Sequence, residues 1–455
     1  MTQKALLSLC EFLSEVNPAS VPSSVEEHAR LVLLDTIGVI IGGSHTREVN
    51  RLAGEFSLTE GEKKGVICPG REELFPPLNA ALLGGISGSS LEYEEGNSRA
   101  MGHPAIQIVP AVIVAGQSED LTVERVLGGL IAGYEAASRV SRASSMRKGL
   151  HPTGTWGVVG CALGAGCAYG RDPEALAEIA NIAASFALSP YIKNSFAGKN
   201  VASTFAGLTN YLGLLANLFF DSGIRADPGS LNMAFSQVVS DKFDPELLCD
   251  DLGKAYAIAE NYFKPYPTCR FTHPSLDALE TILEKEEIDP DEVDRVKIWS
   301  FKAAVHTSSK PPANAEAMRF STPYLVAAML LHGEIELGTL TDGLLQEPRL
   351  KRLVDKVEML YSPEYEKSRP EQNPARVTLR LKNGQEFTHE VLYCRGDPLN
   401  PLSGEAVAAK FLSLASPVTG RERAEGFLRK FNNPGTDEHT RSLIPLLRRA
   451  GNPTG

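Results

Sequence analysis

Apolar positions recur with a helical period over roughly the first 260 residues of the chain. The segment 25–41 is the clearest example, because Ser24 and Glu27 have the spacing of a capping box and Gly42-Gly43 follows the last apolar turn. Other helical segments are rich in small residues, which let helix backbones approach closely. We expect these to be buried central helices: residues 79–90, 157–168 and 179–187.

The pattern changes near residue 270, where short alternating segments occur between helical ones. The predicted elements are a helix over 276–287, a strand over 296–300, a helix over 325–331 that ends at Gly333, and a strand over 356–361. Residues 377–381 and 387–391 flank Asn383-Gly384, which predicts a β-hairpin with a type I′ turn. Helical periodicity returns from Gly404 to about Leu447.

These patterns predict a two-domain protein. Residues 1–268 and 396–455 would form a large all-α helical domain, and residues 269–395 a smaller α+β domain. A chain of 455 residues is long enough to divide in this way.

The composition narrows the class of protein. A hydrophobic content of 43% with 22% charged residues is ordinary for a globular enzyme. The net charge of −11 and the lack of a basic run argue against a nucleic-acid partner. Seven scattered cysteines without a C-x-x-C pair predict reduced thiols and no iron–sulfur cluster. We see no signal-peptide pattern and no apolar run that could span a membrane, and we expect a cytoplasmic protein.

Three of the nine histidines directly precede a proline, namely His103, His151 and His273. With 29 prolines in 455 residues, fewer than one such pair is expected by chance. Proline disfavours a helical conformation at the preceding residue and fits the first position of a helix. Each pair could therefore hold an imidazole at a helix N-terminus, where anions are attracted. This favours an acidic substrate, although a single pair could equally be an ordinary loop before a helix.

Carboxylates precede the first of these histidines. Glu92, Glu94 and Glu95 lie in LEYEEGNSRAMGHP, which ends at His103. Such a group could bind a divalent metal, but the sequence has no established metal-ligand spacing here. A solvated helix end is the plainer interpretation. A carboxylate that orients a catalytic histidine is the functional interpretation that we favour, without a metal.

Two further segments combine cations with a flexible backbone. MRKGLHPTGTW holds His151 and Thr153 beside Arg147 and Lys148, and could bind a carboxylate or be a loop with solvated cations. YIKNSFAGKNVA carries Lys193 and Lys199 between two apolar helical segments. We therefore expect both lysines to be partly buried and to bind an anion.

The segment YFKPYPTCRFTH lies at the junction of the two predicted domains, where ligand clefts often form. It carries Lys264, Arg270 and His273 as candidate site residues. Cys269 could be a nucleophile, but the segment has no signature for one, and we expect a buried thiol.

With these motifs in this order, LEYEEGN…GHPAIQIVP, KGLHPTGTWG and KPYPTCRFTHP, nearly the whole chain resembles the MmgE/PrpD family. That family includes 2-methylcitrate dehydratase, cis-aconitate decarboxylase and iminodisuccinate epimerase. The resemblance implies a helical domain, an α+β lid, a homodimer, and a site between lid and helical domain without metal, iron–sulfur cluster or nucleotide. The family's catalytic positions fall on Glu92, His103, His151, Lys193 and Lys264, and a lid tyrosine falls on Tyr324.

Two departures from the family pattern concern the reaction. Glu92 stands where the family usually has aspartate, and the stretch from Glu95 to His103 is one residue longer. Both changes reshape the surface that would face the substrate.

The resemblance implies chemistry at a carbon next to a carboxylate. Lys193, Lys264 and Arg270 would stabilise the negative charge that develops as a proton leaves, with Lys199, Thr153 and Tyr324 as further substrate-binding residues. One of the two motif histidines would be the base and the other the acid. We expect a cofactor-independent lyase that dehydrates a 2-methylcitrate-like hydroxy acid.

Three alternatives stay open. They are epimerisation of an iminodisuccinate-like dicarboxylate, decarboxylation of a cis-aconitate-like acid, and a non-catalytic carboxylate-binding protein. The last is disfavoured because both histidines and both motif lysines are present. A nucleotide-dependent enzyme is disfavoured because the chain has neither G-x-x-x-x-G-K-S/T nor a strand-borne G-x-G-x-x-G.

Overall fold

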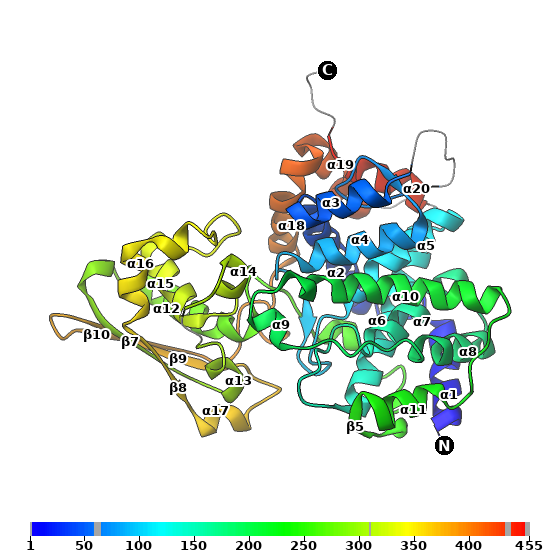
Figure 1. The fold of residues 1–455 in the computed structure, drawn as a ribbon, viewed down its shortest axis with the longest axis horizontal. Coiled ribbons are helices and arrows are strands. Elements are labelled where there is room, and N and C mark those ends of the chain that lie inside the picture. The colour runs from blue at the N-terminus through cyan, green and yellow to red at the C-terminus, as the bar shows by residue number, and fades with distance from the viewer. Residues whose placement is uncertain (1, 59–64, 309–310, 433–437, 451–455) are drawn as a thin grey trace.

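The computed structural model describes residues 2–58, 65–308, 311–432 and 438–450. They form two groups of elements, one almost entirely helical and one built on a small sheet (Figure 1). We call the described residues of 2–263 and 404–447 the helical body and residues 266–391 the sheet unit. Within the described residues, no helix is both long and apolar enough to cross a membrane.

The helical body contains most of the helices. These are α1 (Thr2–Glu15), α2 (Ser23–Gly43), α3 (Arg47–Phe56), α4 (Pro77–Ser89), α5 (Val109–Glu119), α6 (Val123–Ala143), α7 (Gly157–Tyr169), α8 (Pro173–Ala184), α9 (Lys193–Phe196), α10 (Thr204–Asp221), α11 (Ser230–Met233), α18 (Gly404–Thr419), α19 (Arg421–Asn432) and α20 (Thr440–Leu443). Three short antiparallel pairs join its loops: β1 (Val66–Ile67) with β2 (Leu74–Phe75), β3 (Gly96–Asn97) with β6 (Asn261–Tyr262), and β4 (Ser144–Met146) with β5 (Ser240–Phe243).

Small residues set the packing of the central helices, as the sequence predicts. A Cβ atom at Gly133 of α6 would lie 2.8 Å from the carbonyl oxygen of Gly160 in α7. A Cβ atom at Gly164 of α7 would lie 2.7 Å from the carbonyl oxygen of Gly129. The two helix backbones therefore touch directly, and a larger side chain at these positions would force them apart.

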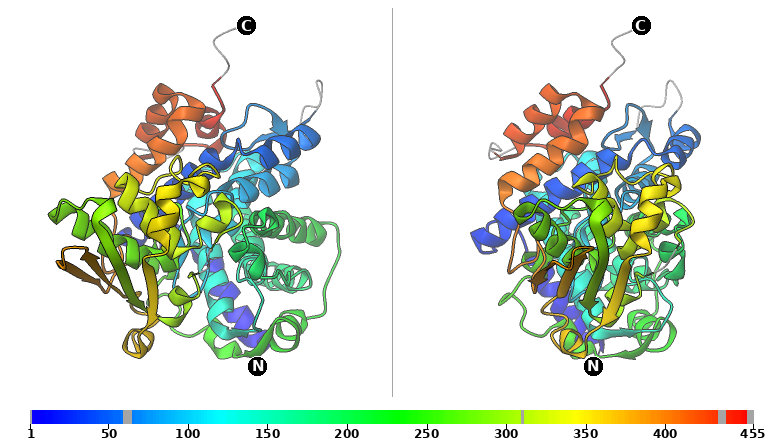
Figure 2. Two further views of the ribbon diagram at one scale, coloured as in Figure 1. Left: turned by 60° about the vertical axis from the view of Figure 1, so that its left-hand side comes forward. Right: turned by 90° about the vertical axis from the view of Figure 1, so that its left-hand side faces the viewer.

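The sheet unit holds a four-stranded sheet in the order β10-β9-β7-β8, in which only β7 and β8 are parallel. Its strands are β7 (Val293–Ser300), β8 (Val357–Tyr361), β9 (Ala375–Leu381) and β10 (Glu386–Val391), and its helices are α12 (His273–Lys285), α13 (Lys302–Val305), α14 (Ala315–Met318), α15 (Thr322–His332), α16 (Pro348–Val354) and α17 (Pro363–Lys367). Alternate strand residues such as Val296, Ile298 and Val377 are buried beneath α12, α15 and α16, and the opposite sheet face is open (Figures 1 and 2).

The two groups have separate hydrophobic cores. The core of the sheet unit is made of residues between Tyr266 and Leu379. The largest core of the helical body joins residues up to Phe263 with Val407, Phe411 and other residues of the last helices. The C-terminal helices thus pack back on the first part of the chain, as Figure 2 shows for α18 and α19 in orange.

Two local predictions are wrong in detail. α2 begins at Ser23 behind Pro22, without a side-chain cap, so the expected capping box of Ser24 does not form. In the β9–β10 hairpin, Gly384 has a φ of 90°, whereas Asn383 is not among the residues with positive φ. Leu381 pairs with Gln385 across a three-residue loop, so the turn is not the type I′ turn expected from Asn-Gly.

Candidate active site

Glu92 and Lys264 form an ion pair where two distant segments meet, with Lys264 buried and Glu92 half-buried. The pairing of β3 with β6 brings these segments together, and only glycine fits at Gly96, because a Cβ atom there would lie 2.3 Å from the hydroxyl oxygen of Tyr262. Lys264 Nζ lies 2.8 Å from Glu92 Oε1 and also donates to the carbonyl oxygen of Glu92 at 3.0 Å. The side chain of Lys264 has no exposed surface.

The two charges stabilise each other. Burial favours the neutral form of each group, but the ammonium of Lys264 and then His103 leave the pKa of Glu92 below its ordinary value. Burial likewise disfavours the charged form of Lys264, yet Glu92 and Glu94 leave its pKa above the ordinary value. Both directions agree, so the pair is ionised at neutral pH.

His103 presents one ring nitrogen as a proton acceptor. It lies two residues before a 3-10 helix (Ala105–Gln107), and its Nδ1 is 2.6 Å from the carbonyl oxygen of Glu95. A carbonyl oxygen only accepts, so Nδ1 carries the proton and Nε2 keeps its lone pair. Burial, and then the charge of Lys264, lower the pKa of His103 to about 4. At neutral pH the ring is therefore uncharged and able to accept a proton at Nε2.

His151 has the opposite tautomer. The backbone N–H of Thr153 donates to His151 Nδ1 at 3.1 Å, so in the neutral ring Nε2 carries the proton. Burial, and then the charge of His103, lower the pKa of His151 to about 4, while Glu92 acts in the opposite direction. His151 is therefore within electrostatic reach of both His103 and Glu92. Thr153 contributes its backbone to the site and is itself buried.

Two more carboxyl groups, those of Glu94 and Glu95, are buried close to the ion pair. Burial raises the pKa of Glu94 to about 7 and that of Glu95 to about 8. Glu94 Oε2 is 3.7 Å from Lys264 Nζ and has no hydrogen-bond partner among the residues that the structure describes. Glu95 accepts from the backbone N–H of Ala105 and from the hydroxyl of Tyr134, each at 2.8 Å.

One group of potential metal ligands lies in this cluster. Single ligand atoms of Glu92, Glu94 and His103 lie within 4.8 Å of one another. The ammonium of Lys264 already occupies this acidic group, and a divalent cation would have to displace it against like-charge repulsion. The donor set therefore fits an ion pair better than a metal, and metal-free chemistry stays a prediction.

The third His-Pro pair has a fully buried ring. His273 begins α12, with both ring nitrogens occupied: Nε2 lies 3.1 Å from the carbonyl oxygen of Thr268, and Nδ1 lies 3.2 Å from Arg270 Nη1. Of the three pairs, only this one begins an α-helix. The expectation of an anion-binding α-helix N-terminus is wrong at His103, which precedes a 3-10 turn, and at His151, where turns precede α7.

The structure does not bring the remaining predicted residues into the cluster. Lys193 and Lys199 are exposed, so the expectation of partial burial is wrong: their loop lies at the surface. Arg270 is buried, ion-paired with Asp397 and stacked on Tyr262, with 4.4 Å from its guanidinium carbon to the ring centre. Tyr324 belongs to the core of the sheet unit.

The cysteines are as expected. All seven have free thiols, and Cys269 is buried. Burial raises the pKa of its thiol to about 12, which makes it a poor nucleophile at neutral pH.

Three charged residues near the site escaped the sequence analysis. Lys410 of α18 pairs with Asp35 of α2 at 2.8 Å, and both are buried. Arg319 follows α14 and donates to the carbonyl oxygens of Leu91 and Pro267 at 2.7 and 2.9 Å. The sequence does contain one signal for Asp35 and Lys410, because each is a single charged residue within an apolar helical pattern.

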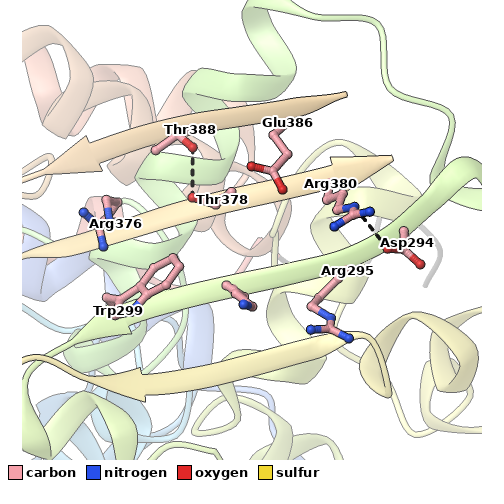
Figure 3. Close-up of a pocket in the computed structure, with 9 residues that line it drawn as sticks. Asp294, Arg295, Trp299, Arg376, Thr378, Arg380, Glu386 and Thr388 are labelled. Carbon is pink, nitrogen blue, oxygen red and sulfur yellow. Dashed lines mark hydrogen bonds and ion pairs between the residues drawn. The ribbon is translucent and has the colours of Figure 1, made fainter. Parts of the chain in front are cut away.

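A separate hollow of about 500 Å³ lies on the open face of the sheet (Figure 3). Its lining is rich in arginine, with Trp299 beside Arg376 and Arg380 near Asp294 at 3.6 Å. It contains no histidine and no buried carboxylate, and its residues come from β7, β9 and β10. The two motif histidines and the buried carboxyl groups of Glu94 and Glu95 lie instead in the cluster around Glu92.

Comparison with known proteins gives a consistent result over the chain. The family model described as the MmgE/PrpD N-terminal domain matches residues 7–248, and that of the MmgE/PrpD C-terminal domain matches residues 266–431. A cis-aconitate decarboxylase-like protein of Aspergillus oryzae is 24% identical over 96% of both chains. Human cis-aconitate decarboxylase is 23% identical over 93% of this chain and 90% of its own. Cis-aconitate decarboxylase of Aspergillus terreus is 22% identical over 92% and 90%.

Proposed function

The chain belongs to the MmgE/PrpD family, and on that premise we propose that it is a cofactor-independent lyase acting on a di- or tricarboxylate. The observation that carries the proposal is the pair of half-buried, neutral histidines with opposite tautomers beside the Glu92–Lys264 ion pair. One ring can accept a proton at Nε2 and the other can donate one, which is the equipment for proton transfer next to a carboxylate.

The charges of the substrate would complete the site. A di- or tricarboxylate brings negative charge close to His103 and His151 and would raise the pKa of both rings from about 4. The imidazolium forms then become accessible at neutral pH, when a proton must be given. The two histidine rings would thus be neutral while the site is empty and able to hold a proton when the substrate is bound.

We place decarboxylation of a cis-aconitate-like acid first, because two of the named relatives are cis-aconitate decarboxylases and the third is a cis-aconitate decarboxylase-like protein. In this reaction the bond to one carboxylate breaks and CO₂ leaves. The electron pair of that bond moves onto the carbon next to a remaining carboxylate. This carbon then receives one proton, which completes the reaction. Only a proton donor is required, a role that fits His151 Nε2.

Dehydration of a 2-methylcitrate-like hydroxy acid is the second candidate, and the opposite tautomers favour it. His103 Nε2 would take the α-proton, and His151 would protonate the hydroxyl that leaves as water. The carboxylate of Glu92, held in place by Lys264, would stabilise the ring of His103 once that ring has taken the proton. Lys193 and Lys199, with exposed ammonium groups, would bind the outer carboxylates.

Proton NMR in D₂O with cis-aconitate, citrate, 2-methylcitrate and iminodisuccinate tests these reactions together. Release of CO₂ with one deuterium in the product supports decarboxylation, and formation of an alkene from a hydroxy acid supports dehydration. Deuterium wash-in without net conversion would indicate epimerisation. No exchange or conversion with any acid would overturn the proposal in favour of a non-catalytic carboxylate-binding protein.

The assembly is proposed on the same premise. We infer a homodimer in the cytoplasm, with residues 1–268 and 396–455 as the helical domain and residues 269–395 as a lid over the site. Sedimentation equilibrium tests the dimer, and small-angle scattering with and without substrate tests movement of the lid.

A further inference from the structure

Two cations, the buried Lys410 and the half-buried Arg319, hold the segments that carry the Glu92–Lys264 pair. Arg319, from the sheet unit, donates from Nη1 to the carbonyl oxygens of Leu91 at 2.7 Å and Pro267 at 2.9 Å. Each carbonyl belongs to a different segment. Arg319 therefore ties the backbone before Glu92 to the backbone after Lys264.

Lys410, from α18 of the helical body, makes the matching contacts on the other side. Its Nζ donates to the carbonyl oxygens of Tyr93 at 2.8 Å and of Lys264 at 3.1 Å. It also pairs with Asp35 at 2.8 Å and lies 3.9 Å from the centre of the Tyr93 ring. Its side chain is only 6% exposed, so these protein groups take the place of water.

The carbonyl groups of Leu91 and Tyr93 flank Glu92 directly along the chain. One is held from the sheet unit and the other from the helical body. From this arrangement we propose that Arg319 and Lys410 are positioning residues that together fix the Glu92–Lys264 pair, and that Arg319 makes the placement of Glu92 depend on where the sheet unit sits. The inference rests on the proposed function for the importance of that pair.

The backbone of Glu92 supports a need for such restraint. Its φ of 53° lies in the left-handed region, which is unfavourable for a residue with a side chain. Residues of this kind persist only where the surroundings fix them. Hydrogen bonds from a cation to a carbonyl are stronger than neutral ones, and two of them bracket this residue.

A direct contact alone does not explain the arrangement. The hydroxyl of Tyr93 donates to the carbonyl oxygen of Pro265 at 3.0 Å, so the two segments already touch. That bond fixes the distance between the segments at one point. Arg319 and Lys410 add one restraint from each group of elements, and so also fix their orientation.

The first test uses the unliganded protein and requires no substrate. Arg319→Met and Lys410→Met, labelled with ¹⁵N-histidine, would be titrated by NMR, with His103 identified through His103→Gln. Burial and the charge of Lys264 together lower the pKa of His103 to about 4. When Lys264 loses its fixed position, this pKa should rise by at least one unit towards the ordinary value.

Matched controls separate this effect from the loss of any cation that donates to a backbone carbonyl. Arg125 donates to the carbonyl oxygen of Ala168 at 3.1 and 2.7 Å, and Lys356 donates to that of Val293, both away from the cluster. Arg125→Met and Lys356→Met should leave the His103 titration unchanged. If Arg319→Met does not fold, Arg319→Lys keeps the charge without the planar guanidinium and should give a smaller shift in the same direction.

The second test measures turnover of the acid that the wild-type enzyme converts. Arg319→Lys should lower kcat about 10- to 100-fold with KM within about threefold, since a displaced catalytic group costs this much. An unchanged His103 titration in folded Arg319→Met and Lys410→Met would overturn the inference. A shifted titration in an enzyme that converts none of the acids would uphold it while the proposed function fails.

Discussion

Glu95 holds the loop of His103 at two points. Its carbonyl oxygen accepts a hydrogen bond from His103 Nδ1 at 2.6 Å, and its carboxyl group accepts one from the backbone N–H of Ala105 at 2.8 Å. The first contact sets the tautomer of the ring, and the second fixes the residue that follows Pro104. The orientation of the proposed base is therefore determined by a residue whose carboxyl group does not touch the ring.

Glu95→Gln should retain nearly full activity. Burial raises the pKa of Glu95 to about 8, so the carboxyl group is largely protonated at pH 7 and an amide has the same shape and charge. Glu95→Ala would leave Ala105 N–H and the Tyr134 hydroxyl unpaired, at a cost of about 1–3 kcal/mol for each group. Urea unfolding and turnover of both variants check this, and equal losses in the two would contradict a neutral Glu95.

His103 and His151 should give different defects. If the reaction is dehydration, in which His103 takes the α-proton, His103→Gln removes the free Nε2 lone pair, and deuterium exchange at the α-carbon should fall by about 10²- to 10⁴-fold. His151→Gln should retain exchange but lose the step that requires a proton donor. NMR in D₂O follows both processes in one sample. Loss of exchange in His151→Gln with retention in His103→Gln would reverse the assignment.

The periodic parts of the fold could be predicted from the sequence. The strand over 296–300 lies within β7, the helix over 157–168 within α7, and the alternation over 356–361 in β8. The turn between β9 and β10 was not predictable in detail, because the loop length there depends on the pairing of Leu381 with Gln385. Local patterns specify elements, whereas registers depend on neighbouring strands.

The site was predictable only in part. The motifs identify Glu92, His103, His151 and Lys264, and the structure brings these four together. Lys410 pairs with Asp35 across more than 370 positions of sequence, and no local pattern encodes such a contact. The exposure of Lys193 and Lys199 was missed because apolar flanking helices do not fix where a loop between them lies.

Stability should depend on pH through His151. Its folded pKa of about 4 lies below the ordinary histidine value of 6.5, so between these values the unfolded chain binds more protons than the folded protein. This contribution is fully present above pH 6.5 and is lost as the pH falls towards 4. The difference in unfolding free energy between wild type and His151→Gln should therefore rise by about 2–3 kcal/mol from pH 4 to pH 6.5.

Chemical denaturation at several pH values provides this measurement. His332→Gln, which changes a histidine with 42% of its side chain exposed, is the control for the loss of a solvent-exposed ring. A flat difference for His151→Gln would show that its ring is not held neutral by burial.

Glu92→Asp should weaken the enzyme although aspartate is the usual residue of the family. The carboxylate would withdraw by about one carbon–carbon bond, ~1.5 Å, from Lys264 Nζ, which now lies 2.8 Å away. We expect kcat/KM to fall about 10- to 100-fold, because the rest of the site is built around the longer side chain. Steady-state kinetics checks this, and higher activity in the variant would show that Glu92 adapts the site to another substrate.

Lys193→Met should affect substrate binding without affecting stability. The ammonium of Lys193 is exposed and lies 6.0 Å from the centre of the Tyr191 ring, so its loss should change the unfolding free energy by less than about 0.5 kcal/mol. If Lys193 binds an outer carboxylate, KM should rise about tenfold, since one charge-assisted hydrogen bond contributes about 1.5–3 kcal/mol. Lys242→Met, at an exposed lysine on β5, is the matched control. Equal KM values for wild type and Lys193→Met would remove Lys193 from the site and leave Lys199 as the candidate on that loop.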